Sequence, residues 1–229
     1  MKNSLFTVMC IFFFTCSYGQ DAEGFTSLFN GENLEGWTSS EDAPESFLVE
    51  DGALVCRGGK AHIYYTGGVG RSDFKNFELK LKVKTMAEAN SGVYFHTRYQ
   101  KDGWPKIGFE AQVNSRHKDP RKTGSLYGIV NMWVQPEEED KFVSKMSDKP
   151  EVFIAREAAP STDGEWFDYH ISVVDKTITI KVDGVITVQW TQPEFWLSNK
   201  RVGHGTFAFQ AHDPTCEVFY KDIRVKVLE

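Results

Sequence analysis

The stretch from Gly108 to Gly128, GFEAQVNSRHKDPRKTGSLYG, combines a polar strand with a loop rich in titratable side chains. Alternation puts Glu110 and Gln112 on one face of the predicted strand, about 7 Å apart. A glycosidase with two catalytic carboxylates needs a second acid where this strand has Gln112. The strand therefore offers one general base and one hydrogen-bonding amide. The alternative is a half-solvated strand followed by an ordinary soluble loop.

The loop that follows contains groups suited to proton transfer and charge stabilisation. His117 can act as a general acid or base near neutral pH, although a single histidine on a loop is more often simply exposed. Lys122 is a cation that can stabilise a developing negative charge. A base, an acid and a cation within thirteen residues indicate a candidate catalytic segment.

Two further strands carry candidate polar groups. His96 and Arg98 alternate along GVYFHTRY, and the short connection to the Glu110 strand predicts that they share its polar face. Arg98 would then donate to Glu110 or to a substrate oxygen; the alternative is that both residues line a polar sheet face without a role. Gln210 and His212 end another strand, in FQAHDP, where they reach the same face or where His212 only caps the turn.

Strand signals dominate the rest of the chain and no sustained helical period is present. A hairpin is predicted about the Asp51-Gly52 turn, and regular alternation predicts a strand over Phe77–Lys84. The other predicted strands are Gly92–Tyr99, Ile107–Val113, Tyr169–Val174, Thr177–Val182, Val185–Trp190, Thr206–Gln210 and Glu217–Val227. These short strands predict an all-β, two-sheet antiparallel jelly-roll sandwich with under about 10% helix. The segment Gln135–Asp163 lacks this rhythm and is predicted to be a long surface loop.

The N-terminus indicates export. Lys2, the apolar run Leu5–Phe14 and the Ser17-Tyr18-Gly19 site predict a signal peptide over residues 1–19, cleaved before Gln20. The alternative is a lipoprotein anchored at Cys16. Residues 20–229 are then expected to form a single domain in the periplasm or outside the cell. There Cys56 and Cys216 either pair or stay as buried free thiols.

Composition narrows the class of ligand. The net charge of −6 argues against nucleic acid or an anionic membrane as a partner, and the predicted apolar run is too short to span a membrane. No Cys/His zinc spacing and no calcium loop occurs in the sequence. Among the tryptophans, Trp104 and Trp133 are candidates for stacking on sugar rings, whereas Trp37 is expected in the core.

Several motifs resemble the 3-keto-disaccharide hydrolase family. They are GFTSLFNGENLEGW at Gly24–Trp37, NSGVYFHTRY at Asn90–Tyr99, the opening stretch, and FQAHDPTCEVFYKDIRVKVLE at Phe209–Glu229. The resemblance implies a concanavalin A-like sandwich of the lectin and glucanase type, secretion, and action on glycosides with a ketone at C3. It also implies a pocket made of Arg98, Glu110, Gln112, His117, Lys122, Tyr127 and His212. His96 departs from the family pattern.

A ketone at C3 makes elimination a route to glycosidic cleavage. It acidifies the C2 hydrogen, so the oxygen at C1 leaves after proton abstraction and water then adds to the enone. This path requires one base, a donor for the enolate and an acid for the leaving group. We therefore predict Glu110, His117, Arg98 and Lys122 as catalytic residues, and Gln112, Tyr127, His96, Gln210 and His212 as substrate-binding residues.

The predicted function is a secreted enzyme that cleaves 3-keto-glycosides. Its partner is an oligosaccharide or glycoside. The sequence assigns no cofactor and leaves a divalent metal open, which could replace the lysine as electrophile. Two other classes stay open at this level. One is a carbohydrate-binding module or lectin on the same fold, and the other is a structural or adhesion domain.

Overall fold

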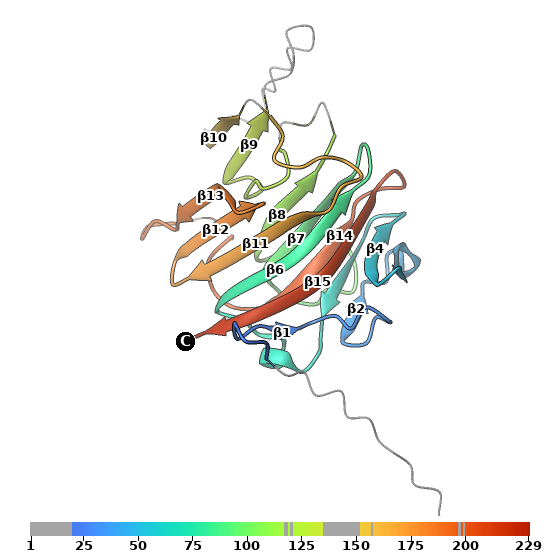
Figure 1. The fold of residues 1–229 in the computed structure, drawn as a ribbon. Coiled ribbons are helices and arrows are strands. Elements are labelled where there is room, and N and C mark those ends of the chain that lie inside the picture. Colours follow the sequence, from blue (N-terminus) through green and yellow to red (C-terminus); the bar gives the residue numbers. More distant parts are fainter. Residues whose placement is uncertain are drawn as a thin grey trace, which may run out of the picture.

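The chain folds as two antiparallel β-sheets packed face to face, as Figure 1 shows. The computed structural model describes residues 20–116, 119, 121–134, 152–156, 158–196, 198 and 200–229. The predicted all-β, two-sheet antiparallel sandwich is confirmed. The predicted signal peptide lies outside the described residues. Within the described ranges, no helix has the length and apolar character needed to cross a membrane.

The larger sheet has the strand order β13-β12-β11-β6-β15-β4-β3, with β1 paired to β15. Figure 1 shows β4, β15, β6, β11, β12 and β13 side by side as one layer. The bounds are β1 Thr26–Ser27, β3 Phe47–Glu50, β4 Ala53–Arg57, β6 Asn76–Thr85, β11 Phe167–Val174, β12 Thr177–Val182, β13 Val185–Thr191 and β15 Glu217–Leu228.

The smaller sheet has the order β2-β5-β14-β7-β8, and it lies behind the larger sheet in Figure 1. Its strands are β2 Trp37–Ser39, β5 Ala61–Tyr65, β7 Asn90–Thr97, β8 Phe109–Asn114 and β14 Thr206–Ala211. A separate parallel pair joins β9 Val130–Val134 to β10 Val152–Arg156. The described helical structure consists of two short 3₁₀ turns, Pro44–Ser46 and Val69–Ser72.

Side-chain alternation explains why these segments form a sandwich. Along β6 the odd-numbered residues from Phe77 to Val83 are buried, while the lysines between them are partly exposed. This period of two is the pattern expected of a strand with one face against a core. The predicted hairpin between β3 and β4 turns at Asp51 and Gly52, both of which have positive φ angles (48° and 75°), as a two-residue turn of this kind requires.

Aromatic rings fill the space between the sheets. Phe207 of the smaller sheet stacks on Phe74 at 4.6 Å between ring centroids and meets the edge of Phe77 at 4.9 Å. Trp37 is buried as predicted and stacks on Phe209 at 5.1 Å. Large aromatic surfaces buried in this way dominate the energetics of a core.

One hydrogen bond crosses the core directly beneath the polar strand β8. The Tyr169 hydroxyl of β11 donates to the Gln112 carbonyl at 2.9 Å, and both residues are buried. Because a buried hydroxyl needs a partner, this bond holds the larger sheet and β8 in one relative position.

The structure corrects one prediction, on the long surface loop, and decides between the two alternatives for the cysteines. Residues 152–156, expected within a surface loop, form β10, because they pair in parallel with β9 over their whole length; residues 135–151 lie outside the described residues. Cys56 and Cys216 are both buried and both free thiols.

We expect Phe207→Ala to lower the free energy of unfolding by about 3–5 kcal/mol, because it leaves a cavity between two stacked rings. The matched control is Phe195→Ala, since Phe195 is 88% exposed and contributes little burial. Chemical denaturation of both variants provides the measurement. Equal midpoints for the two variants would contradict this account of the core.

Candidate active site

The strand β8 presents Glu110 and Gln112 on the outer face of the smaller sheet. Ala111 and Val113, which alternate with them, belong to the apolar core, so the predicted orientation of the strand is confirmed. The free edge of β8 is covered by residues 122–127. Gly124 donates to the Gln112 carbonyl and Tyr127 donates to the Glu110 carbonyl, both at 2.9 Å. The chain after the loop therefore returns to the polar strand and forms one wall of a pocket above it.

This pocket has a volume of about 520 Å³. It is lined by Asn90, Tyr94, Trp104, Pro105, Lys106, Gly108, Glu110, Gln112, Asp119, Arg121, Tyr127, Lys200, Gln210 and His212. These residues come from three neighbouring strands, β14, β7 and β8, and from the loops around them. A concave site with a few convergent polar groups is the usual form of a small-molecule site.

Glu110 lies at the base of the pocket and is only 6% exposed. Its carboxylate rests above Gly92 of β7, where a Cβ atom would collide with it. The Tyr94 hydroxyl, directly across the strand pair, donates to Glu110 Oε2 at 2.8 Å. Burial raises the pKa of Glu110 to about 7, although Tyr94 and the nearby cations oppose the shift. Glu110 can therefore take up and release a proton near neutral pH.

Lys200 supplies a partly buried cation that lines the same pocket. Its Nζ donates to the Tyr127 carbonyl at 3.0 Å and lies 4.7 Å from the centroid of the Tyr127 ring. Burial lowers the pKa of Lys200, whereas the charge of Glu110 raises it. Arg121 contacts the other side of this arrangement, where its Nη1 donates to the Tyr127 hydroxyl at 2.8 Å. Tyr127 thus holds two cations at one wall.

The floor of the pocket, on β8 and β14, presents amide oxygens. Gln112 donates its Nε2 to Asn90 Oδ1 at 2.9 Å, and Gln210 donates its Nε2 to the Tyr94 hydroxyl at 3.0 Å. Because the amide nitrogens make these bonds, the side-chain oxygens of Gln112 and Gln210 face away from Asn90 and Tyr94. Neither oxygen has a hydrogen-bond partner within the described ranges, although both are buried. Buried acceptors without partners are costly, and a ligand hydroxyl would satisfy them.

The pocket brings together five of the predicted residues, namely Glu110, Gln112, Tyr127, Gln210 and His212. His212 lies at the end of β14, where its Nδ1 pairs with Asp213 Oδ2 at 2.8 Å. Its ring lies 5.3 Å from that of Trp104, which the sequence indicated as a stacking residue. His212 thus lies against an aromatic side chain in addition to ending its strand.

Arg98 and His96 do not line the pocket, which corrects the expectation that they share its floor. The reason is a bulge where β7 pairs with β14, at which His96 adopts a left-handed φ of 53°. The alternation fails there, and His96 turns toward the Lys75 carbonyl and the Phe77 ring. Arg98 follows the end of the strand, is exposed, and lies 3.5 Å from His204 Nε2.

Lys122 does not take the position in the pocket that a catalytic role requires. Lys122 is buried away from the pocket lining, and its Nζ donates to the Arg116 carbonyl. The predicted acid His117 lies outside the described residues. The cations that do reach the pocket are Lys106, Arg121 and Lys200.

Lys200, Arg121 and Gly92 were not among the predicted site residues. Lys200 comes from a loop between β13 and β14 with no local signal of its own. Gly92, in contrast, stands opposite Gln112 on the neighbouring strand and beside the Tyr94–Glu110 pair. A glycine within a strand often marks a close approach, and this one makes room for the carboxylate.

The described residues contain no group of three or more His, Cys, Asp or Glu side chains that could hold a metal ion. Glu110 has Tyr94, the cations Lys200 and Arg121 and the carboxylate of Asp119 as neighbours, and His212 lines the same pocket. Within the described part of the chain these side chains form no ligand group for the divalent metal that the sequence left open, and no step below involves one.

Fold and pocket together define a β-sandwich with a polar, partly cationic site on the outer face of its smaller sheet. The model of one family, described as the 3-keto-alpha-glucoside-1,2-lyase-like domain, matches residues 24–226. The chain therefore belongs to this family, and the family resemblance found in the sequence is confirmed.

The chain is also similar in sequence to a named relative and in fold to solved structures. A Bacteroides thetaiotaomicron protein named 3-keto-disaccharide hydrolase is 24% identical over 237 residues, which cover 91% of this chain and 80% of the relative. A crystal structure from Parabacteroides distasonis, named provisionally as a glycosyl hydrolase, superposes with a TM-score of 0.66 at 23% identity, covering 91% of this chain and 95% of the other. The carbohydrate-binding module CBM66 from Bacillus subtilis superposes with a TM-score of 0.52 at 10% identity, covering 83% and 95%. These structures share the sandwich fold.

We expect Glu110→Gln to stabilise the protein at alkaline pH. The pKa of Glu110 is raised from 4.5 to about 7, so the folded state binds more protons than the unfolded state between these values. Stability of the natural chain therefore falls as pH rises through this window, by on the order of 1–3 kcal/mol. The glutamine retains an acceptor for Tyr94 without the charge. Thermal unfolding at pH 5 and pH 8 should show a gain that is larger at pH 8; an equal gain at both would contradict the raised pKa.

Proposed function

We propose that this protein is a carbohydrate-active enzyme that cleaves the glycosidic bond of 3-keto-glycosides by elimination followed by hydration. The observation that carries the proposal is one buried carboxyl, Glu110, facing the same pocket as the partly buried ammonium of Lys200. The family match and the name of the Bacteroides relative support this choice of substrate. We also propose that it acts in the periplasm or outside the cell, as the N-terminal segment predicts.

Glu110 is the general base in the first step. Its carboxylate removes the proton from C2, and the electrons of that C–H bond form an enolate with the C3 ketone. Burial raises the pKa of Glu110 to about 7, which makes it a stronger base than an exposed carboxylate at the same pH. The Tyr94 hydroxyl, hydrogen-bonded to Oε2, fixes the direction of the carboxylate. Because the ionised form is required, the rate should rise with pH through this pKa.

Lys200 and Arg121 stabilise the enolate oxygen that forms at C3. Both line the pocket on the wall built around Tyr127, and both carry N–H donors suited to an oxyanion. The unpartnered amide oxygen of Gln112 lies on the floor of the pocket, on β8, and accepts from a hydroxyl of the reacting ring. The donors on one wall and the acceptor on the floor orient the ring. The ketone oxygen, which can only accept, faces the cations, and a hydroxyl, which can donate, faces the amide oxygen.

Collapse of the enolate expels the oxygen at C1 and leaves a double bond between C1 and C2. His212 lines the pocket and is placed to protonate the leaving oxygen: its Nδ1–H pairs with Asp213, and in the imidazolium form Nε2 carries the second proton, which it donates. Water then adds to C1 and a proton to C2, so the net reaction is hydrolysis. We assign the acid role to His212 because it lines the pocket, while His117, the acid that the sequence indicated, lies outside the described residues.

A non-catalytic carbohydrate-binding protein is the second candidate. It is favoured by the exposed Trp104 at the pocket and by the structural similarity to CBM66. Incubation with a disaccharide and its 3-oxidised form distinguishes the two functions. Binding of both without cleavage of either would support the binding protein.

Cleavage in heavy water should place deuterium at C2 of the released keto-sugar, because the C2 proton is lost before water adds. Mass spectrometry or proton NMR of the product measures the label against a control without enzyme, which gives the background enolisation. Glu110→Gln should lower the rate at least about a hundredfold, since it removes the base and keeps the shape. Protium retained at C2, together with an active Glu110→Gln variant, would refute the elimination mechanism.

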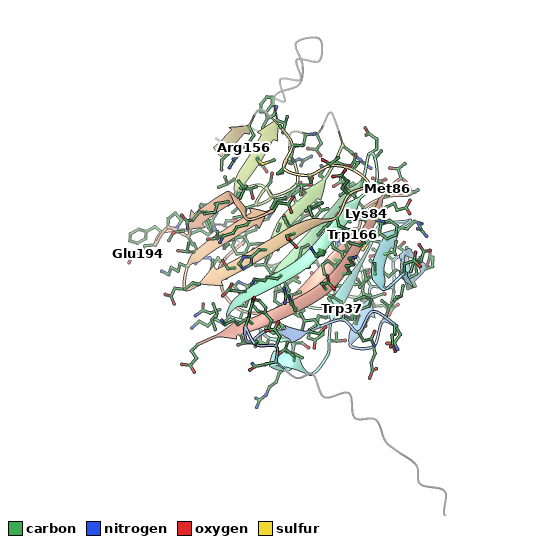
Figure 2. All side chains as sticks on the ribbon, viewed as in Figure 1. Trp37, Lys84, Met86, Arg156, Trp166 and Glu194 are labelled. Carbon is green, nitrogen blue, oxygen red and sulfur yellow. The ribbon has the colours of Figure 1, made fainter. Side chains whose placement is uncertain are left out.

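Lys200→Met should lower kcat about a hundredfold or more, because it removes a donor to the enolate while keeping a similar chain length. Lys84→Met is a matched control, because Lys84 lies beside Trp166 on the outer face of the larger sheet (Figure 2). Its Nζ is 5.1 Å from the centroid of the Trp166 ring. Steady-state kinetics of both variants on a 3-keto-glycoside give the comparison. If Lys200→Met retained full kcat, the proposed role of Lys200 would be wrong.

A further inference from the structure

Trp104 lines the pocket beside His212. The side chain is 45% exposed, yet its backbone is anchored. Gln100 donates to the Trp104 carbonyl at 3.0 Å and accepts from the Lys106 N–H at 2.7 Å, while the Gly103 N–H donates to Asp42 at 2.8 Å. An exposed indole on an anchored loop is a suitable platform for an apolar sugar face.

His62 of β5 lies beneath Trp104 and is fully buried. Its ring meets the edge of Trp104 at 5.5 Å and of Tyr94 at 5.3 Å. Neither ring nitrogen has a hydrogen-bond partner within the described part of the chain. Burial lowers the pKa of His62 to about 4, so the neutral ring carries one donor and one acceptor, both unused. Such a group is costly in a core and calls for a polar partner.

Gln210 stands directly opposite His62 in the pairing of β14 with β5. Its amide oxygen is buried, lines the pocket and lacks a donor. His62 and Gln210, which are neighbours on one face of the sheet, therefore both have polar atoms without hydrogen bonds close to Trp104. This capacity is separate from the contacts of Glu110, which is already bonded to Tyr94.

The distance across the sheet fits two sugar rings better than one. The strands β5, β14, β7 and β8 are consecutive neighbours, and Tyr64, Ala208, Tyr94 and Glu110 form one row across them. Three strand spacings amount to about 14 Å from the β8 row position to the β5 position. His62 lies on β5, next to this row, so a ring bound over Glu110 leaves room for another toward His62.

We propose that Trp104, His62 and Gln210 form a subsite for the second ring of a disaccharide. The indole stacks on this ring, the Gln210 oxygen accepts from one hydroxyl, and Trp104 shifts off His62 so that the imidazole bonds another. The inference rests on the proposed function, which places the reacting ring over Glu110. It makes the preferred substrate a disaccharide rather than a glycoside with a small aglycone.

The test compares a 3-keto-disaccharide with the 3-keto form of a methyl glycoside. We expect Trp104→Ala and His62→Phe each to lower the ratio of their kcat/KM values at least tenfold. The phenylalanine keeps the aromatic contact and removes only the ring nitrogens. Trp166→Ala and His170→Phe, on the larger sheet, are the matched controls (Figure 2 labels Trp166). An unchanged ratio in both pocket variants would overturn the subsite.

Binding keeps this test separate from the proposed reaction. Calorimetry on the Glu110→Gln background measures the affinity for the disaccharide with and without Trp104→Ala, a surface change that does not threaten folding. A tenfold loss of affinity for the disaccharide, with a smaller loss for the methyl glycoside, supports the subsite even if the natural chain cleaves neither compound. Equal losses for both ligands would overturn it.

Discussion

A carboxyl group buried on the face of a β-sheet is the constraint around which the pocket is arranged. An ionised carboxylate loses its hydration when it is buried, and this costs several kcal/mol unless polar partners compensate. Glu110 is compensated from three directions: the Tyr94 hydroxyl bonds it, Gly92 makes room for it, and the cation of Lys200 opposes its charge. The compensation is partial, which leaves the carboxyl reactive toward protons at neutral pH.

The polar groups of the pocket are segregated by type. Cationic donors occupy the wall that contains Tyr127, and amide acceptors occupy the floor on β8 and β14. A ligand with hydroxyls on one side and a carbonyl on the other has one orientation that satisfies both. Hydrogen bonds within the protein fix the segregation, because Asn90 and Tyr94 occupy the amide N–H groups of Gln112 and Gln210. Specificity is therefore set by residues that do not themselves have to contact the ligand.

Local sequence patterns predicted much of the fold, and five of the site residues that they named line the pocket. Alternation correctly placed β6, β8 and the outward direction of Glu110 and Gln112, because a period of two is a property of neighbouring residues. It failed at His96, where one residue with a left-handed φ shifts the register of everything after it. Lys200 was missed for another reason: a loop residue reaches the pocket only through long-range packing against Tyr127. Val152–Arg156 became a strand only because β9 offers it a partner.

The segment over residues 122–127 has a consequence beyond the pocket. The strand β8 is the last in its sheet, and a bare terminal strand exposes a row of backbone N–H and C=O groups to which another chain can add. Gly124, Ser125 and Tyr127 occupy these groups, so the wall of the pocket also closes the edge of the sheet. Catalytic geometry and resistance to aggregation are therefore linked in this protein. A substitution that detaches residues 122–127 from β8 would disrupt the pocket. It would also expose unpaired backbone groups of β8, to which another chain could bind.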